Sequence, residues 1–260
     1  MLTIASYTLR DVLRSRFSVA YFAFFFSIAW GLLNFEGDGA RAVLSLMYAT
    51  LWVVPLVGIV FGTLYLYNQE DFNLLVLSHP VARSTLYAGL FGGLTLSFGM
   101  GFFLGTGLPF LFLGFLDPKS LRLLSILLVL GVFLTAIFIA LGMLVAISVQ
   151  SRTKGLGVSL GAWVFMGILY DGLILWLVHT FGDYPLERPL LFLSFLNPLD
   201  LGRILLLLQT DLSSLMGYTG ALFKWFLGGG LGMALALLSL VLWVLWPFLL
   251  GLSLFSRKDL

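Results

Sequence analysis

The chain has 260 residues, of which 60% are hydrophobic and only 10% are charged, and its mean hydropathy is +1.08. Soluble domains carry roughly 25% charged residues, so this composition excludes a soluble globular protein and makes the lipid bilayer the expected solvent. The net charge of +2 is too small to indicate a nucleic-acid-binding protein. The absence of cysteine excludes disulfides, thiolate metal sites and cysteine nucleophiles.

The first sixteen residues predict an amphipathic helix that lies in the membrane interface. A cytosolic helical extension is the alternative. Arg10, Arg14 and Arg16 precede an apolar run of about 20 residues, which is long enough to be a membrane span rather than the core of a cleaved signal peptide. The apolar residues that share one face of the expected helix are Leu2, Ala5, Leu9, Val12 and Leu13.

Six apolar runs, each long enough to cross a bilayer, follow one another along the chain. The fold class is therefore expected to be all-α, as a six-span membrane protein with a single transmembrane domain over residues 1–260. The second run contains Pro55, a possible kink, and the third contains Gly101 and Gly105 at the spacing that lets helices approach closely. The expected spans are Phe17–Phe35, Ala42–Tyr67, Leu86–Leu116, Leu121–Val149, Leu156–Phe181 and Ala221–Phe255, with short polar loops at Glu36–Arg41, Asp117–Ser120 and Gln150–Gly155.

The stretch between the fifth and sixth runs is apolar but broken in its middle. Asn197 and Pro198 interrupt it, and Asp200 and Arg203 follow closely. Proline stops a helix and each half is too short to span. We expect two helices of about eight to ten residues that enter and leave the outer leaflet as a re-entrant pair.

The distribution of basic residues predicts that both termini face the cytoplasm. With that orientation the inner side carries eight basic residues and the outer side six. The inner set is Arg10, Arg14, Arg16, Arg83, Arg152, Lys154, Arg257 and Lys258, and the outer set is Arg41, Lys119, Arg122, Arg188, Arg203 and Lys224.

The longest polar break on the inner side is residues 68–89. Asn68 is expected to cap a short helix, with Glu70 and Asp71 in its first turn, where the helix dipole favours acids. Pro80 is expected to end it, because the residue before a proline avoids the α region. A new helix is expected to begin near Ser84.

Few residues offer chemistry. No lysine follows a glycine, so a G-x-x-x-x-G-K-[ST] phosphate loop is absent and any energy from ATP must come from a partner. The G-x-S-x-G match around Ser159 lies inside a span, with no histidine near it, and indicates helix packing more than an intramembrane protease. Two distant histidines and scattered methionines give little support for a metal site.

Asp171 is the one acidic residue well inside a span, next to Tyr170. A buried carboxylate is costly in a membrane and must pair, take up a proton or face water. It is expected to be a polar element of the conduit or a latch to the outer helices. The equally weighted alternative is a structural ion pair or hydrogen bond with Arg203, Lys224 or a tyrosine.

Residues 69–89 resemble the signature of type-2 ABC exporter permeases, in which an acid, a Leu-Leu pair, Pro-Val-x-Arg and a glycine follow one another. The order of elements is similar as well. Two departures from the family's pattern are Asp71-Phe72-Asn73 in place of Gly-Thr after the acid, and Leu90 in place of lysine after the glycine. The resemblance implies a coupling helix that docks into a separate ATPase. The residues that it implies for this docking are Glu70, Asp71, Phe72, Leu74, Leu75, Pro80, Val81 and Arg83.

A narrower resemblance, to NosY-type permeases of nitrous-oxide reductase maturation, covers the second half of the chain. It is carried by residues 150–155, Leu169-Tyr170-Asp171, Asn197-Pro198-Leu199-Asp200 and Arg203-Ile204-Leu205. It implies an inner-membrane location, a periplasmic accessory protein, and a role in assembling copper–sulfur centres with a sulfur species as cargo.

Six spans make a thin conduit, so a homodimer with two ATPase copies is expected, with no cofactor in this chain and ATP and Mg²⁺ in the ATPase. The glycine-rich third span and an aromatic face of the first span are candidate packing surfaces, with lipid contact as the alternative for the aromatic face. Rival functions are a permease of this fold for a drug, lipid or peptide, an intramembrane serine protease, and an assembly subunit that transports nothing. The aromatic face comprises Tyr21, Phe22, Phe24, Phe25 and Phe26.

Overall fold

A computed structural model describes residues 2–69, 76, 81–182, 184, 186–209 and 229–257. Within these residues all regular structure is helical and there is no strand, which confirms the all-α class. The chain divides into two compact units, one of residues 1–160 with 244–260 and one of residues 161–243. Each unit is described by itself.

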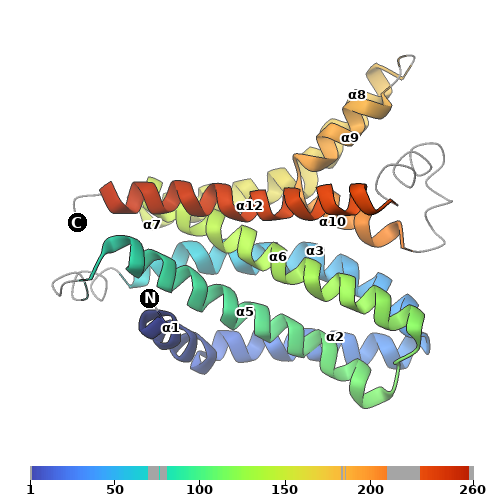
Figure 1. The fold of residues 1–260 in the computed structure, drawn as a ribbon, viewed down its shortest axis with the longest axis horizontal. Coiled ribbons are helices and arrows are strands. Elements are labelled where there is room, and N and C mark those ends of the chain that lie inside the picture. Colours follow the sequence, from blue (N-terminus) through green and yellow to red (C-terminus); the bar gives the residue numbers. More distant parts are fainter. Residues whose placement is uncertain are drawn as a thin grey trace. The chain divides into compact units, whose positions relative to one another are not determined.

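The first unit is a bundle of long helices (Figure 1). The last helix of the chain, α12 (Gly230–Arg257), contributes its C-terminal part to this unit and its N-terminal part to the second. The other helices of the first unit are α1 (Leu2–Arg14), α2 (Arg16–Glu36), α3 (Gly39–Asn68), α5 (Arg83–Leu113), α6 (Pro118–Ser148) and most of α7 (Arg152–Val164).

The second unit continues the helix that α7 begins. Five residues, Phe165–Leu169, form a π-helical segment, η1, and α8 (Tyr170–Thr180) follows without a break. Two short helices come next, α9 (Glu187–Phe195) and α10 (Pro198–Leu207). Their lengths of 9 and 10 residues agree with the two short outer helices predicted from the sequence.

Within the described residues, six helices are long and apolar enough to cross a membrane, as predicted. Each is 21–31 residues long, and the helices α7, η1 and α8 together form one 29-residue span. Residues 189–195 and 198–207 pass the same test only as a pair, which is bent by 110°. The break at Asn197–Pro198 therefore makes a sharp corner, and the chain is a multi-pass membrane protein.

Aspartates at the ends of two turns cap the next helix, so the turns differ from the predicted ones. The turn before α3 is reduced to residues 37–38, and the turn before α6 is shifted to residues 114–117. Asp38 accepts a hydrogen bond from the Ala40 N–H at 2.8 Å, and Asp117 accepts one from the Ser120 N–H at 3.0 Å. Hydrogen bonding from Ser120 also holds the pKa of the Asp117 carboxyl below its usual range. Arg152 and Lys154, predicted to lie in a loop, belong to the first turn of α7.

Small residues on α5 explain how α1 and α2 pack in the first unit. A methyl group on Gly93 would come within 2.5 Å of the Thr8 Cβ on α1, and one on Gly105 within 2.9 Å of the Phe22 carbonyl oxygen on α2. The close approach predicted at Gly101–Gly105 is therefore confirmed, and it occurs inside the subunit. The contact between α5 and α1 continues along α5. Ser97 donates a hydrogen bond to the Leu9 carbonyl oxygen, and a methyl group added at Gly89 would meet Ile4.

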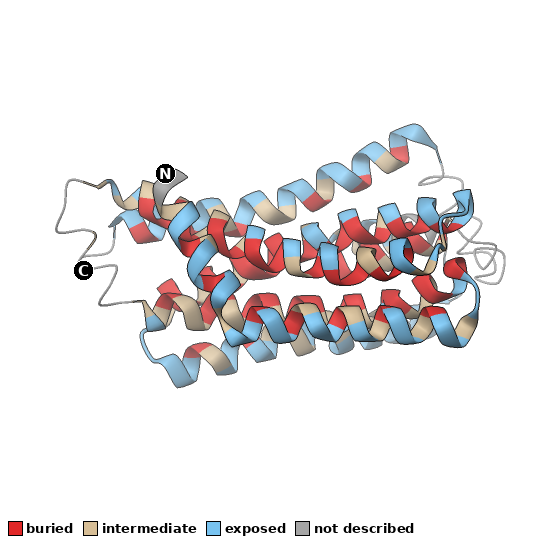
Figure 2. Cartoon of the chain, turned by 90° about the horizontal axis from the view of Figure 1, so that it is seen from below, coloured by how far each residue is buried: buried red, intermediate tan, exposed pale blue. Residues whose placement is uncertain are grey.

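The predicted aromatic face of α2 is divided between packing and exposure. Tyr21 and Phe25 are buried, and their rings lie 5.5 Å from Phe98 and 5.0 Å from Phe102, respectively. Phe24 points outward with 40% of its surface exposed. In Figure 2, red and pale blue residues alternate along the helices, so each span has a buried and an exposed face. Tyr21 and Phe25 are buried in contacts within the subunit and cannot contact a second copy of the chain.

Candidate functional site

Most of the predicted coupling segment lies outside the described residues. This applies to Glu70, Asp71, Phe72, Leu74, Leu75 and Pro80. Val81 and Arg83 are described: both are half-buried, and Arg83 is the first residue of α5. Asn68 is the last residue of α3, which the Gln69 N–H caps by donating to the Tyr65 carbonyl oxygen. The expectation that Asn68 starts the short helix was wrong, because the second span continues one residue beyond its apolar run.

Helix α3 ends and α5 begins at one end of the bundle of the first unit (Figure 1). The first helix lies at this end, because Tyr65 on α3 donates a hydrogen bond to Asp11 at 3.2 Å and a methyl group on Gly89 would contact Ile4. The end of α12 also lies here, with the Tyr87 and Phe255 rings 5.5 Å apart. We call this the basic end of the first unit.

The basic end is named for its charge. Its described residues include seven arginines and lysines and one acid, Asp11. The opposite end of the first unit carries three of each sign: Arg41, Lys119 and Arg122 against Glu36, Asp38 and Asp117. The seven cationic residues of the basic end are Arg10, Arg14, Arg16, Arg83, Arg152, Lys154 and Arg257.

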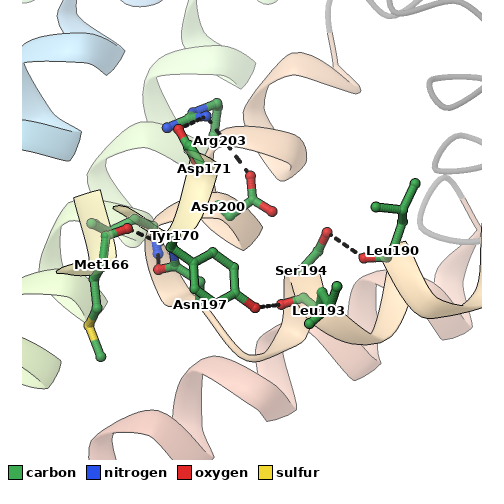
Figure 3. A network of polar contacts seen from close by, with 10 residues as sticks. Met166, Tyr170, Asp171, Leu190, Leu193, Ser194, Asn197, Asp200 and Arg203 are labelled. Atoms are coloured by element: carbon green, nitrogen blue, oxygen red, sulfur yellow. Dashed lines mark hydrogen bonds and ion pairs between the residues drawn. The ribbon is translucent and has the colours of Figure 1, made fainter. Parts of the chain in front are cut away.

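The second unit holds a polar cluster at the bend between α9 and α10, drawn in Figure 3. Its centre is Arg203, whose Nη1 lies 2.9 Å from the Asp171 Oδ2 and 4.0 Å from the Asp200 Oδ1. The arginine therefore faces two carboxylates, one from the fifth span and one from its own helix. The side chains of Asp171 and Arg203 are 33% and 31% exposed, so the pair is partly screened by solvent.

Two further contacts tie the bend to the fifth span. Tyr170 donates from its hydroxyl to the Leu193 carbonyl oxygen at 2.6 Å. Asn197 donates from Nδ2 to the Met166 carbonyl oxygen at 2.8 Å and accepts from the Leu199 N–H at 3.0 Å, so it caps α10 as well. Pro198 is the first residue of α10, a position where its missing N–H costs nothing.

The sequence thus found the residues of the cluster, and the structure brings them together. Among the described residues that were considered as partners of Asp171, Arg203 pairs with it. Lys224 lies outside the described residues.

Three contributors to the cluster were missed. The π-helical segment carries no sequence signal: its last N–H, at Tyr170, bonds to the Phe165 carbonyl five residues back, while the Met166 carbonyl oxygen accepts from Asn197. Ser239 and Trp243, both on α12, donate hydrogen bonds to the Phe195 carbonyl oxygen at the end of α9, at 3.3 and 3.1 Å. Two polar side chains four residues apart in an apolar span could have indicated this contact.

The contacts of the cluster are of the kind that attach one helix to another. Arginine holds carboxylates through charge-assisted hydrogen bonds, and none of the described residues forms a group of three or more side chains able to hold a metal ion. Ser159, in the G-x-S-x-G match, is fully buried, and its hydroxyl lies 2.6 Å from the Thr63 hydroxyl. This is the packing role predicted for it.

Comparison with known proteins agrees with the fold. A model of the ABC-2 family transporter proteins matches residues 45–260, which include parts of both units. The chain is 26% identical to a protein of Pseudomonas aeruginosa named "Probable ABC transporter permease protein NosY", over 83% of this chain and 84% of that protein. A protein of the same name from Stutzerimonas stutzeri is also 26% identical, over 98% of this chain and 97% of its own length. The chain therefore belongs to the ABC-2 transporter family and is a permease of the NosY type.

Proposed function

We propose that this permease, driven by a separate ATPase subunit, delivers a sulfur species across the membrane for the copper–sulfur centres of nitrous-oxide reductase. Membership of the ABC-2 family makes the chain the transmembrane subunit of an ABC transporter, which works with an ATPase. The reductase-specific part rests on the second-half motifs and on similarity to proteins named NosY. ATP and Mg²⁺ are bound by the ATPase in this proposal.

The observation that carries the proposal is the basic end of the first unit. The positive-inside rule assigns such an end to the cytoplasm, where an ATPase would reach it. α3 ends and α5 begins at this end, which supports a docking role for the segment that connects them. We assign docking to Glu70, Asp71, Phe72, Leu74, Leu75, Pro80, Val81 and Arg83, with Glu70 and Arg83 making charge-assisted contacts.

The polar cluster has the complementary role on the outer side. The fifth span begins at the basic end with Arg152 and runs for 29 residues, about 43 Å at 1.5 Å per residue. Asp171, Tyr170 and the α9–α10 bend at Asn197, Pro198, Asp200 and Arg203 then belong to the outer half of the membrane. We propose that they hold the outer helices to the fifth span, where a periplasmic accessory protein can receive cargo, in a homodimer with two ATPases.

Loss of either charged docking residue tests the ATPase interface. Glu70→Ala and Arg83→Ala are expected to lower recovery of the ATPase with the affinity-purified permease, or to uncouple its ATP hydrolysis, while leaving membrane insertion intact. Arg122→Ala, an exposed arginine at the opposite end, is the control and should behave as wild type. ATPase recovery and coupled hydrolysis at the wild-type level in both docking variants would contradict the assignment.

The cargo is tested separately in a nitrous-oxide-respiring bacterium that lacks its own permease of this type. Expression of this chain with its ATPase should restore the copper–sulfur absorption of the reductase and nitrous-oxide reduction. Restoration of neither, with the permease and ATPase present in the membrane as a complex, would favour a permease of the same fold for another cargo.

A further inference from the structure

The last two turns of α3 are fastened to the start of the fifth span by two side chains. The first is Tyr67, whose hydroxyl donates to the Val149 carbonyl oxygen at 2.5 Å and lies 3.5 Å from that of Ser151. Both acceptors belong to the turn between α6 and α7. The tyrosine also covers Gly155 so closely that a Cβ there would collide with the hydroxyl.

The second fastening is one helical turn earlier, at Thr63. Its hydroxyl lies 2.7 Å from the Ile59 carbonyl oxygen, 3.1 Å from that of Gly142 on α6, and 2.6 Å from the Ser159 hydroxyl on α7. Thr63 has one hydrogen to donate and already faces two carbonyl oxygens, so Ser159 is the donor in their pair. Thr63 and Ser159 are both fully buried, where a lost hydrogen bond is costly.

Backbone contact makes the junction stiff. A methyl group on Gly62 of α3 would lie 2.6 Å from the Ile139 carbonyl oxygen of α6, and one on Gly142 would collide with the backbone of α3. No flexible side chain separates these two helices there. The ends of α3 and α6 therefore form one close-packed block, to which the Tyr67 and Thr63 side chains hold the first turns of α7. Such a block transmits strain because protein interiors are not readily compressed.

We propose that this block is the relay that carries displacement of the coupling segment into the fifth span, with Tyr67 and Thr63 as its positioning residues. The proposal rests on the proposed ATPase coupling and adds the route. The coupling segment begins directly after α3, two residues beyond Tyr67. A push on it moves α3, and the two hydroxyl groups oblige the start of α7 to move with α3.

The same span then carries the π-helical segment at residues 165–169, followed by Tyr170 and Asp171. A π-helical turn inside an α-helix holds one extra residue and is a common site of local adjustment. The fifth span is thus rigidly driven at its first two turns and adjustable further along. This division suits a helix that converts an input at one end into rearrangement near its polar residues.

The absence of native cysteine allows a test that does not require the cargo. A single cysteine is placed at Gly172 in α8, where an added Cβ meets nothing within 4 Å. The full chain is reconstituted in nanodiscs with its ATPase, and the rate of maleimide labelling is measured with and without ATP. ATP is expected to change this rate, and Tyr67→Phe is expected to abolish most of the change while ATPase binding and basal ATP hydrolysis remain.

Tyr48→Phe is the matched control, since Tyr48 lies on the same helix but is 59% exposed. It should label as the parent does. Ser159→Ala removes only the hydrogen bond to Thr63 and should lose part of the ATP-dependent change in labelling. This variant replaces Tyr67→Phe in the test if Tyr67→Phe is poorly folded. A merely structural role for Tyr67 would lower stability but would leave the ATP-dependent change in labelling intact.

A disulfide provides the converse experiment. The Thr63 and Ser159 hydroxyl oxygens are 2.6 Å apart, so Thr63→Cys with Ser159→Cys brings two sulfurs within reach of an S–S bond of about 2.05 Å. In the oxidised protein, labelling of the Gly172→Cys position should still respond to ATP, because the two helices move as one. A response abolished by the disulfide would mean that α3 and α7 must separate, and would overturn the relay.

The relay and the coupling proposal fail in different ways. If the ATPase does not co-purify with the parent chain, or ATP does not alter labelling in the bound complex, the coupling is wrong and the relay is wrong with it. If ATP alters labelling equally in the parent, Tyr67→Phe and Ser159→Ala, the relay alone is overturned.

Discussion

At the scale of single residues, the structure pairs the Asp171 carboxylate, which lies in the fifth span, with an arginine. Asp171 would be expensive alone in a membrane span, and Arg203 meets it at 2.9 Å from a helix 32 residues further along the chain. Asp200 lies 4.0 Å from the same arginine. One cation thus serves two carboxylates, so its removal leaves both without their partner.

We expect Arg203→Ala to lower the thermal unfolding temperature in detergent. Breaking a buried ion pair costs about 3–5 kcal/mol, but these side chains are about a third exposed, which reduces the expected loss to roughly 1–2 kcal/mol. Asp171→Asn combined with Arg203→Gln should lose less, because only the Asp200 carboxylate, which lies 4.0 Å from the arginine, is then left without it. Arg122→Ala, an exposed substitution, should change the free energy of unfolding by no more than about 0.5 kcal/mol. An equal effect of Arg203→Ala and Arg122→Ala would show that the ion pair does not stabilise the chain.

At the scale of elements, neighbouring glycines on α5 have unequal importance. Gly93 has no space for a Cβ against Thr8 and Ala5 of α1, whereas Gly92, its neighbour, has nothing within 4 Å. Composition alone treats both as part of one glycine-rich span. Which of them allows a helix to approach depends on the face that α1 covers.

We expect Gly93→Ala to destabilise the first unit by about 1–3 kcal/mol, as overpacking does, because α1 would have to move away from α5. Gly92→Ala should be neutral or slightly stabilising, since alanine favours helix by about 1 kcal/mol over glycine. Thermal unfolding and protease sensitivity of the α1–α2 junction would compare the two. A destabilisation of equal size in both variants would contradict the packing of α1 on α5.

At the scale of the whole molecule, the six spans and the unequal charge of the two ends bear on membrane orientation. The basic end of the first unit holds seven cationic residues against one acid among those described, while the opposite end is balanced. The start of α1 and the end of α12 both contact the first turns of α5 at the basic end. An even number of spans agrees with this arrangement.

Single cysteines at the two ends test the orientation directly, because the native chain has none. We expect Lys119→Cys to react with a membrane-impermeant maleimide in intact cells with a permeabilised outer membrane. Arg257→Cys should react only after the inner membrane is broken. The reverse pattern would place the basic end outside and remove the docking assignment for residues 69–83.

The sequence by itself determined the class, the six spans and the two short helices between the fifth and sixth spans, because hydrophobic run length and proline breaks are local properties. It also identified the polar residues of the bend. Helix ends were less accurate, because the aspartates at 38 and 117 act as caps and the helices that follow them begin earlier than predicted.

Only the tertiary structure decided which partner each residue meets. It selected Arg203 for Asp171, placed Ser159 against Thr63, and buried Tyr21 and Phe25 inside the subunit. It also revealed the π-helical segment and the contact of Tyr67 with the α6–α7 turn. The contacts of Asp171, Ser159 and Tyr67 join residues that are 32, 96 and 82 positions apart in the chain, respectively. Hydrophobic periodicity along the chain does not predict contacts between such distant residues, because the partner of a side chain is set by how whole helices pack.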